Sequence, residues 1–380
     1  MRQVGTQSSA YVVDLTAGTV LYASRAAVRR VPASVEKLYT VTTALDRFGP
    51  DARLTTSVLG TGTLSHGVYT GTLYLRGGGD PTFGSAAFDN ANYGPGKGAT
   101  VQQLAANLVR ATGIRVLRGR VVGDETIFDA DRGTPATGNR PATEVLGELS
   151  GLSFDRGWSN PYGTAFFSHP AIQAATELIG ALRADGVRVP RDTPAEAGTT
   201  PAAATKLASV QSPTIAGLLA MTLPPSDNYF AETLLKDIGA RFGAGGTTAA
   251  GAAVVRAQMA SQFGIHPRLN DGSGLSYFDR TSPIQVVTLL RGMATDPAFT
   301  GALAVAGETG TLAQRMVGTF AQGRCRGKTG TLDAVSNLAG YCTARDGHTL
   351  AFALLMNSVD PYYAHPVQDA MTLAVARYAG

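Results

Sequence analysis

The chain has 380 residues, a formal net charge of +4, 44% hydrophobic residues and 16% charged residues. This length allows two or more domains, and the composition is that of a globular protein with an ample core rather than a disordered or fibrous chain. No basic stripe interleaved with aromatic residues exists, which argues against a nucleic-acid partner, and no run of 18 apolar residues could form a transmembrane segment.

The N-terminal region predicts a hairpin followed by a helix. Residues 9–23 contain two apolar runs around Thr16-Ala17-Gly18, which is typical of a β-hairpin. Pro32 then precedes an apolar-periodic stretch through Phe48, which predicts a helix opened by proline. Residues 1–6 lack the apolar core of a signal peptide. We therefore expect either a cytoplasmic protein or an exported one whose signal peptide is absent from this chain.

The middle of the chain alternates between strand and helix patterns. These lie at residues 71–76, 101–111, 115–122 and 171–184. The run Gly77-Gly78-Gly79-Asp80-Pro81 lacks the spacing and the lysine of a phosphate-binding loop, so it predicts a tight turn at the exit of a strand. A stretch rich in proline, alanine and threonine, residues 199–204, ends the region.

The C-terminal region predicts two strands, 335–343 and 348–357, and an amphipathic helix at 366–378. Strands at both ends of the chain imply one sheet assembled from the two termini. The predicted fold class is therefore α/β (α+β), with an antiparallel sheet flanked by helices. Residues 1–56 plus 206–380 would form a discontinuous catalytic domain, and residues 57–205 an inserted accessory domain.

The two cysteines, Cys325 and Cys342, are placed symmetrically about a predicted turn at Asp333-Ala334. They would therefore lie opposite each other on neighbouring strands. Two buried thiols and a disulfide are both compatible with this placement. The disulfide is slightly favoured and would imply an oxidising compartment.

Lysine is rare in this chain. Only five of the 32 lysine and arginine residues are lysines, and two of them fall in short motifs that also contain serine or threonine. The motifs are Ser34-Val35-Glu36-Lys37 and Lys328-Thr329-Gly330, with Ser226-Asp227-Asn228 between them. Arginine cannot act as a base near neutral pH, whereas the pKa of a lysine can be lowered by burial and neighbouring positive charge. The retained lysines therefore indicate amine chemistry.

The motifs Ser34-Val35-Glu36-Lys37 and Ser226-Asp227-Asn228 suit nucleophilic catalysis without a histidine. Ser34 and Lys37 would share one face at the start of a helix, so Lys37 can take the Ser34 proton if burial, the helix N-terminus and Lys328 lower its pKa. Ser226 is placed to relay a proton to the leaving amine, and Asn228 to hold a substrate amide. Asp227 is expected to cap its own loop.

The motif Lys328-Thr329-Gly330 predicts a substrate-binding strand. Lys328, Thr329 and Thr331 offer positive charge and hydroxyl donors for a terminal carboxylate. Gly330 lacks a side chain, so a substrate backbone could pair along the strand. The amide N–H groups of Ser34 and Thr331 are the candidates for the oxyanion hole.

These motifs, in this order, occur in penicillin-binding proteins and class A β-lactamases. The chain resembles the class C low-molecular-mass penicillin-binding proteins, the D-alanyl-D-alanine carboxypeptidase/endopeptidase family. Four further stretches carry the resemblance: Leu73–Thr82, Asp271–Ser276, Gly307–Leu312 and Arg326–Leu332. The long segment between the first two motifs is also typical of this family and is far shorter in class A β-lactamases.

The resemblance implies a penicillin-binding, transpeptidase-like fold and a serine D-Ala-D-Ala carboxypeptidase of peptidoglycan stem peptides. Ser34 would form an acyl-enzyme, and penicillins and other β-lactams would acylate it too. The enzyme would be exported to the cell envelope, on the periplasmic or extracellular face, and would need no cofactor or metal. In the family, an acidic residue of the insert can bind a diamino acid. Asp124, Asp129 and Asp131 lie in a plausible stretch, but the residues that follow depart from the family pattern, so we expect all three to be solvated at the surface.

Other functions have weaker support. A β-lactamase needs a base for the deacylating water, and no glutamate can be named for that role. A non-catalytic penicillin-binding sensor or scaffold would keep the serine but release no D-alanine. The five histidines show no metal-binding spacing, and no Gly-x-Ser-x-Gly nucleophile motif is present.

Overall fold

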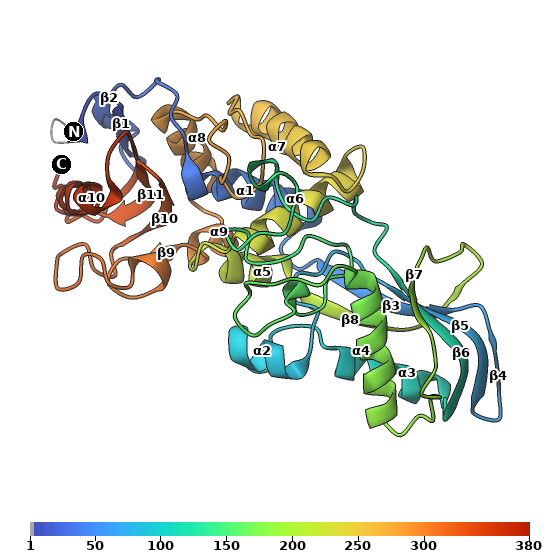
Figure 1. Cartoon of the computed structure of the whole chain (residues 1–380). Coiled ribbons are helices and arrows are strands. Elements are labelled where there is room, and N and C mark those ends of the chain that lie inside the picture. Colours follow the sequence, from blue (N-terminus) through green and yellow to red (C-terminus); the bar gives the residue numbers. More distant parts are fainter. Residues whose placement is uncertain (1–3) are drawn as a thin grey trace. The chain divides into compact units, whose positions relative to one another are not determined.

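The computed structural model describes residues 4–380, coloured along the chain in Figure 1. Residues 1–3, part of the stretch inspected for a signal peptide, lie outside the described residues. The chain divides into two compact units. The first unit contains the N-terminal residues up to Pro50 together with Ala216–Gly243 and Thr248–Gly380, and the second contains Asp51–Ile215 and Ala244–Thr247. Every helix within residues 4–380 is too short or too polar to cross a membrane.

The first unit is built on a six-stranded sheet in the order β2-β1-β12-β11-β10-β9. All its pairings are antiparallel, and β1 from the N-terminus pairs with β12 from the C-terminus. The strands are β1 (Ser8–Asp14), β2 (Thr19–Ser24), β9 (Ala304–Val305), β10 (Cys325–Leu332), β11 (Val335–Thr343) and β12 (Thr349–Asn357). The prediction of an antiparallel sheet assembled from both ends of the chain is confirmed.

Both faces of this sheet are covered by helices, so β11 and β12 are almost continuously buried. Successive side chains of a strand point to opposite faces. Tyr341 donates its hydroxyl to Leu290 O of α8, 2.6 Å away, whereas Cys342 lies against Thr372 of α10. The apolar core beneath α10 includes Leu338 and Phe352.

Among the described residues, the first unit also contains the helices and 3₁₀ turns on which the site and the sheet depend. They are η2 (Ala33–Glu36), α1 (Lys37–Phe48), α6 (Asn228–Phe242), α7 (Thr248–Phe263), α8 (Pro283–Met293), α9 (Pro297–Gly301), η5 (Gly310–Leu312) and α10 (Pro361–Ala376), with α5 (Ile215–Thr222) at the junction of the two units.

The C-terminal helix begins earlier than predicted. α10 starts at Pro361, and the Asp360 side chain caps it by accepting from Tyr362 N at 2.8 Å. The prediction took Pro366 as the first residue, but Pro366 lies inside the helix. A proline there removes one backbone hydrogen bond, which the cap and the packing of α10 on the sheet compensate.

The second unit has its own sheet, in the order β7-β6-β5-β3-β8, with β4 paired to β5. Its elements are β3 (Arg53–Gly60), β4 (Thr63–Ser65), β5 (Val68–Arg76), α2 (Ala86–Asn92), α3 (Val101–Thr112), β6 (Val116–Asp124), η3 (Pro135–Thr137), η4 (Asp155–Gly157), α4 (Pro170–Ala184), β7 (Ala195–Ala197) and β8 (Thr205–Thr214). Apolar side chains of α3 and α4 form its core with those of β5 and β6. β3 and β8 span the expected domain boundaries at 56/57 and 205/206.

The glycine run after β5 forms the expected tight turn. A Cβ on Gly77 would lie 2.0 Å from Gly151 O, and one on Gly78 would lie 2.2 Å from Thr55 O. Gly79 has φ +78°, a conformation that side chains disfavour. Backbone packing within the second unit therefore accounts for these glycines.

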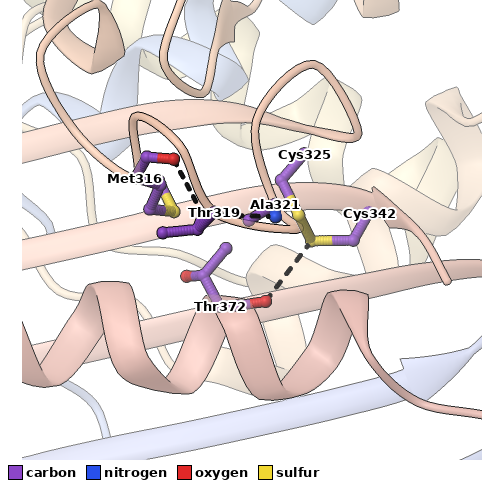
Figure 2. Close-up of a disulfide and its surroundings, with 6 residues drawn as sticks. All are labelled: Met316, Thr319, Ala321, Cys325, Cys342 and Thr372. Atoms are coloured by element: carbon purple, nitrogen blue, oxygen red, sulfur yellow. Dashed lines mark hydrogen bonds between the residues drawn. A yellow bond between two sulfur atoms is a disulfide. The ribbon is translucent and has the colours of Figure 1, made fainter. Parts of the chain in front are cut away.

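Cys325 and Cys342 form a disulfide between β10 and β11, the alternative that the sequence slightly favoured (Figure 2). Both residues are buried, and Cys342 Sγ lies 3.9 Å from Thr372 O of α10. The disulfide covalently ties together the beginning of β10, three residues before Lys328, and the end of β11.

Candidate active site

The three predicted motifs meet within the first unit, beginning with Ser34 and Lys37. Lys37 Nζ lies 2.9 Å from Ser34 Oγ. Ser34 is on the 3₁₀ turn η2 rather than on an α-helix, and Lys37 begins α1. Side chains three residues apart eclipse each other on a 3₁₀ turn, so this local geometry brings the amine directly to the hydroxyl.

Lys37 has two further partners, Asn228 Oδ1 at 2.6 Å and the backbone oxygen Ser273 O at 2.8 Å. Both are acceptors, so they occupy two N–H groups of the amine. The third position faces the Ser34 hydroxyl, which can either accept or donate. An uncharged amine, with two N–H groups and one lone pair, is therefore fully satisfied here when Ser34 donates its proton to the lone pair.

Burial lowers the pKa of Lys37 to about 8, although the carboxylates of Glu232 and Asp271 act in the opposite direction. Burial, followed by the positive charge of Lys37, holds the pKa of Lys328 well below its usual value. Both lysines are fully buried. The predicted effect of burial is present, but the carboxylates around Lys37 were not anticipated.

Four buried acidic residues act on the charge of this base: Glu232, Asp271, Asp227 and Glu36. Glu232 Oε1 accepts from Gly272 N at 3.0 Å and from Ser273 N at 2.8 Å. Asp271 accepts from two further backbone N–H groups of the same loop, Gly274 N and Ser276 N. The loop 271–276 therefore holds two carboxylates with its amides while its Ser273 carbonyl accepts from Lys37.

Glu36 lies in a cluster of buried carboxyl groups with Asp271 and Asp279. One carboxylate oxygen each from Glu36, Asp271 and Asp279 lie within 4.8 Å of one another, and within the described chain no N–H or O–H donor reaches either Glu36 oxygen or Asp279 Oδ2. Carboxylates this close in a dry interior cannot all be charged. Burial, followed by the charges of Asp279 and Asp271, raises the pKa of Glu36 well above its usual value.

The Ser226-Asp227-Asn228 motif forms the turn that begins α6. Ser226 adopts φ +64°, which is unusual for a residue with a side chain. Asp227 was expected to cap its own loop; in the structure its side chain caps α6 by accepting from Phe230 N at 3.0 Å. Asn228, the first residue of the helix, thereby reaches Lys37.

The Lys328–Thr331 motif lies on β10, as predicted. Lys328 Nζ donates to Thr329 O at 2.8 Å, and Thr329 Oγ1 donates to Thr311 Oγ1, also at 2.8 Å. Thr331 is exposed, and Thr329 is largely buried. Thr311 belongs to the stretch Gly307–Leu312, to which the sequence assigned no chemical role.

Gly330 packs against the nucleophile turn. A Cβ there would lie 2.7 Å from Pro32 O, 3.0 Å from Val35 N and 3.1 Å from Ser34 N. The missing side chain therefore lets β10 approach the backbone of Ser34, which is a different reason from the expected approach of a substrate. Gly274 has a similar role, since its Cβ would lie 2.0 Å from Ala33 O.

Of the three aspartates expected at the surface, Asp124 is buried, so that expectation was wrong for this residue. Asp124 Oδ1 accepts from Thr126, and Oδ2 accepts from Thr200 N at 2.7 Å. It ties the end of β6 to a segment far along the chain. Asp131 is exposed and Asp129 is half-buried.

The antiparallel sheet with helices on both faces, and a buried lysine hydrogen-bonded to a serine one turn away, fit the class of serine enzymes that contains the penicillin-binding proteins and class A β-lactamases. The model of the D-Ala-D-Ala carboxypeptidase 3 (S13) family matches residues 2–141 and 160–378. The chain belongs to this family. The predictions of this family, its fold class and a serine-type D-Ala-D-Ala carboxypeptidase are confirmed.

Individual relatives support this family assignment. The chain is 30% identical to a D-alanyl-D-alanine carboxypeptidase of Actinomadura sp. (strain R39), over 99% of this chain and 82% of the relative. It is 32% identical to carboxypeptidase DacB of Mycolicibacterium smegmatis, over 92% of this chain and 76% of that protein. The crystal structure of penicillin-binding protein 4 from Haemophilus influenzae has the same fold, with a TM-score of 0.81, 18% identity, and coverage of 99% of this chain and 98% of that one.

Proposed function

We propose that Ser34 is the nucleophile of this carboxypeptidase and that Lys37 is its general base. The observation that carries the proposal is the three-partner geometry of Lys37: its amine lies within hydrogen-bond distance of Asn228 Oδ1, Ser273 O and Ser34 Oγ, so an uncharged amine that donates to the first two can accept from the Ser34 hydroxyl. With a pKa of about 8, about a tenth of the Lys37 side chains are uncharged at pH 7. A base with a pKa close to the working pH is the most effective kind.

In the proposed first step, Lys37 takes the Ser34 proton while Ser34 Oγ attacks the carbonyl between two D-alanines. The amide N–H groups of Ser34 and Thr331 stabilise the oxyanion that develops. Ser226 relays a proton to the leaving amine, and the last D-alanine departs. Water then attacks the ester on Ser34 and releases the shortened peptide.

We propose that Asn228 has two functions, binding the Lys37 amine and orienting a substrate amide. Lys328, Thr329 and Thr331 would bind the carboxylate of the leaving residue, while Gly330 allows the strand to approach Ser34. A carboxylate entering the site would also raise the pKa of Lys328 again and restore its charge.

The substrates we propose are peptidoglycan stem peptides that end in D-Ala-D-Ala. In a peptidoglycan cross-link, the amino group on a D-configured carbon of a second stem peptide replaces the last D-alanine. The bond to be cleaved is of the same kind, so we propose endopeptidase activity as well. Penicillins and other β-lactams would acylate Ser34. Because this substrate lies in the cell envelope, we propose that the protein is exported and acts there, consistent with its disulfide.

We further propose that the second unit is an accessory domain. None of the predicted catalytic or substrate-binding residues lies in Asp51–Ile215 or Ala244–Thr247. All the chemistry described above belongs to the first unit.

Mass spectrometry of the benzylpenicillin-treated protein tests the proposal. We expect one covalent adduct on the peptide that contains Ser34, and release of free D-alanine from a stem-peptide mimic that ends in D-Ala-D-Ala. Ser34→Ala should abolish both. An adduct on a peptide without Ser34 would refute the assignment, whereas rapid loss of the adduct would indicate a β-lactamase instead.

A further inference from the structure

Thr311 is exposed, yet the backbone that carries it is fixed on several sides. Gly310 has φ +56°, and a Cβ there would lie 2.3 Å from Pro224 O. Thr311 N donates to that same oxygen at 2.9 Å. Pro224 immediately precedes Pro225 and Ser226, so this turn is anchored to the loop that bears the Ser226-Asp227-Asn228 motif.

The residues on either side of Thr311 are anchored too. Thr309 Oγ1 accepts from Val305 N of β9 at 2.9 Å, and Leu312 is buried in the core of the first unit. The turn therefore fixes the position of the exposed Thr311. It requires glycine at position 310, because any other residue there would be strained. Such fixed placement is typical of a group that contacts a ligand.

The Thr311 hydroxyl is also oriented for donation. It accepts from Thr329 Oγ1 at 2.8 Å, and within residues 4–380 no acceptor takes its own hydrogen. Thr311 lies beside the unpaired edge of β10. In the described chain β9 pairs only with Arg326 and Gly327, so the edge from Lys328 onward is free to pair with an extended peptide.

We propose that Thr311 contacts the substrate and, together with Lys328, recognises the free carboxylate on the residue that carries the leaving amine, while Thr329 Oγ1 donates to Thr311 Oγ1 and holds that hydroxyl in place. This inference rests on the proposed function, because it takes the start of the Lys328–Thr331 motif as the carboxylate site. A peptide that pairs along β10 ends where the turn Thr309–Thr311 begins. Thr311 donates a hydrogen bond to the carboxylate, and Thr329 donates a hydrogen bond to Thr311.

The test compares two thioester substrates that have the same acyl group, one with a free carboxylate on the leaving group and one with a carboxamide. Thr311→Val is isosteric but has no hydroxyl, and Thr311→Ser restores the hydroxyl. Thr288→Val, whose hydroxyl donates to Ile284 O on the surface of α8, is the matched control. The readout is kcat/KM for each substrate, with fluorescent penicillin labelling of Ser34 alongside.

For Thr311→Val we expect kcat/KM on the carboxylate substrate to fall about tenfold or more, since a hydrogen bond to a charged group is lost. The carboxamide substrate should change less than about twofold, and Thr311→Ser should recover most of the loss. An equal fall on both substrates, or no fall on either, would overturn the inference while leaving the proposed function intact. A wild-type protein that cleaves neither substrate and is not labelled at Ser34 would overturn both.

Discussion

Replacing Lys37 by arginine separates positive charge from basicity at one position. With a pKa of about 8, half of the Lys37 side chains are uncharged at pH 8. Arginine has a pKa above about 12, so its uncharged fraction at pH 8 is on the order of one in ten thousand. If the free amine takes the Ser34 proton, Lys37→Arg should slow acylation by about four orders of magnitude.

The assay is the second-order rate constant for labelling by a fluorescent penicillin at pH 8. Lys206→Arg, at an exposed position of β8, is the matched control and should acylate at the wild-type rate. Thermal unfolding must show that Lys37→Arg still folds, because Lys37 is fully buried. Acylation by a folded Lys37→Arg protein within tenfold of wild type would remove Lys37 from the role of base.

The pH profile of the wild-type protein checks the same reasoning. Because the base must be unprotonated, the rate of acylation should fall about tenfold for each pH unit below about 8, and level off above it. A rate that stays constant down to pH 6 would contradict the assignment.

Three further predictions concern stability. Gly330→Ala would place a Cβ 2.7 Å from Pro32 O, so urea unfolding should show a loss of about 1–3 kcal/mol together with slower acylation; unchanged values would show that β10 can move away from the nucleophile turn. Replacing both Cys325 and Cys342 by serine should cost about 3 kcal/mol of unfolding free energy, and reducing agent should lower wild-type stability by a similar amount but leave the variant unaffected. Burial raises the pKa of Glu36, so the stability that this group contributes is fully present below its unfolded-state pKa and is lost as pH rises through its folded-state pKa. Glu36→Gln should therefore flatten the dependence of the melting temperature on pH above about pH 5; an unchanged dependence would show that Glu36 carries no proton.

Much of the first unit could be predicted from the sequence because short-range sequence patterns indicate its helices and strands. The hairpin of β1 and β2, the proline that opens the nucleophile turn, and the strands β11 and β12 all follow from short-range patterns. The symmetry of the two cysteines about a turn predicted that they lie opposite each other, and it favoured a disulfide only slightly over two buried thiols. The start of α10 was misplaced because two prolines lie close together, and the one that opens the helix is marked by the Asp360 cap.

The partners of Lys37 could not be predicted in the same way. Ser273 lies 236 residues from Lys37 along the chain, and no spacing rule connects them. The burial of Asp124 depends on Thr200 N, a contact across 76 residues. The stretches Asp271–Ser276 and Gly307–Leu312 were recognised only as family resemblances, because their chemistry depends on loops that fold against the catalytic motifs.

The loop Asp271–Ser276 explains how a fully buried lysine can remain a useful base. Burial alone can lower the pKa of a lysine to about 5–6, at which the amine would be uncharged but too weak to take a proton from serine. Here Glu232 and Asp271 raise it again, and both carboxylates are held in the interior by backbone amides of this loop. The loop also provides Ser273 O as an acceptor for the same amine, and Gly274 packs on Ala33 beside the nucleophile. The basicity of Lys37 and the position of Ser34 therefore depend on one segment that does not itself take part in the proposed chemical steps.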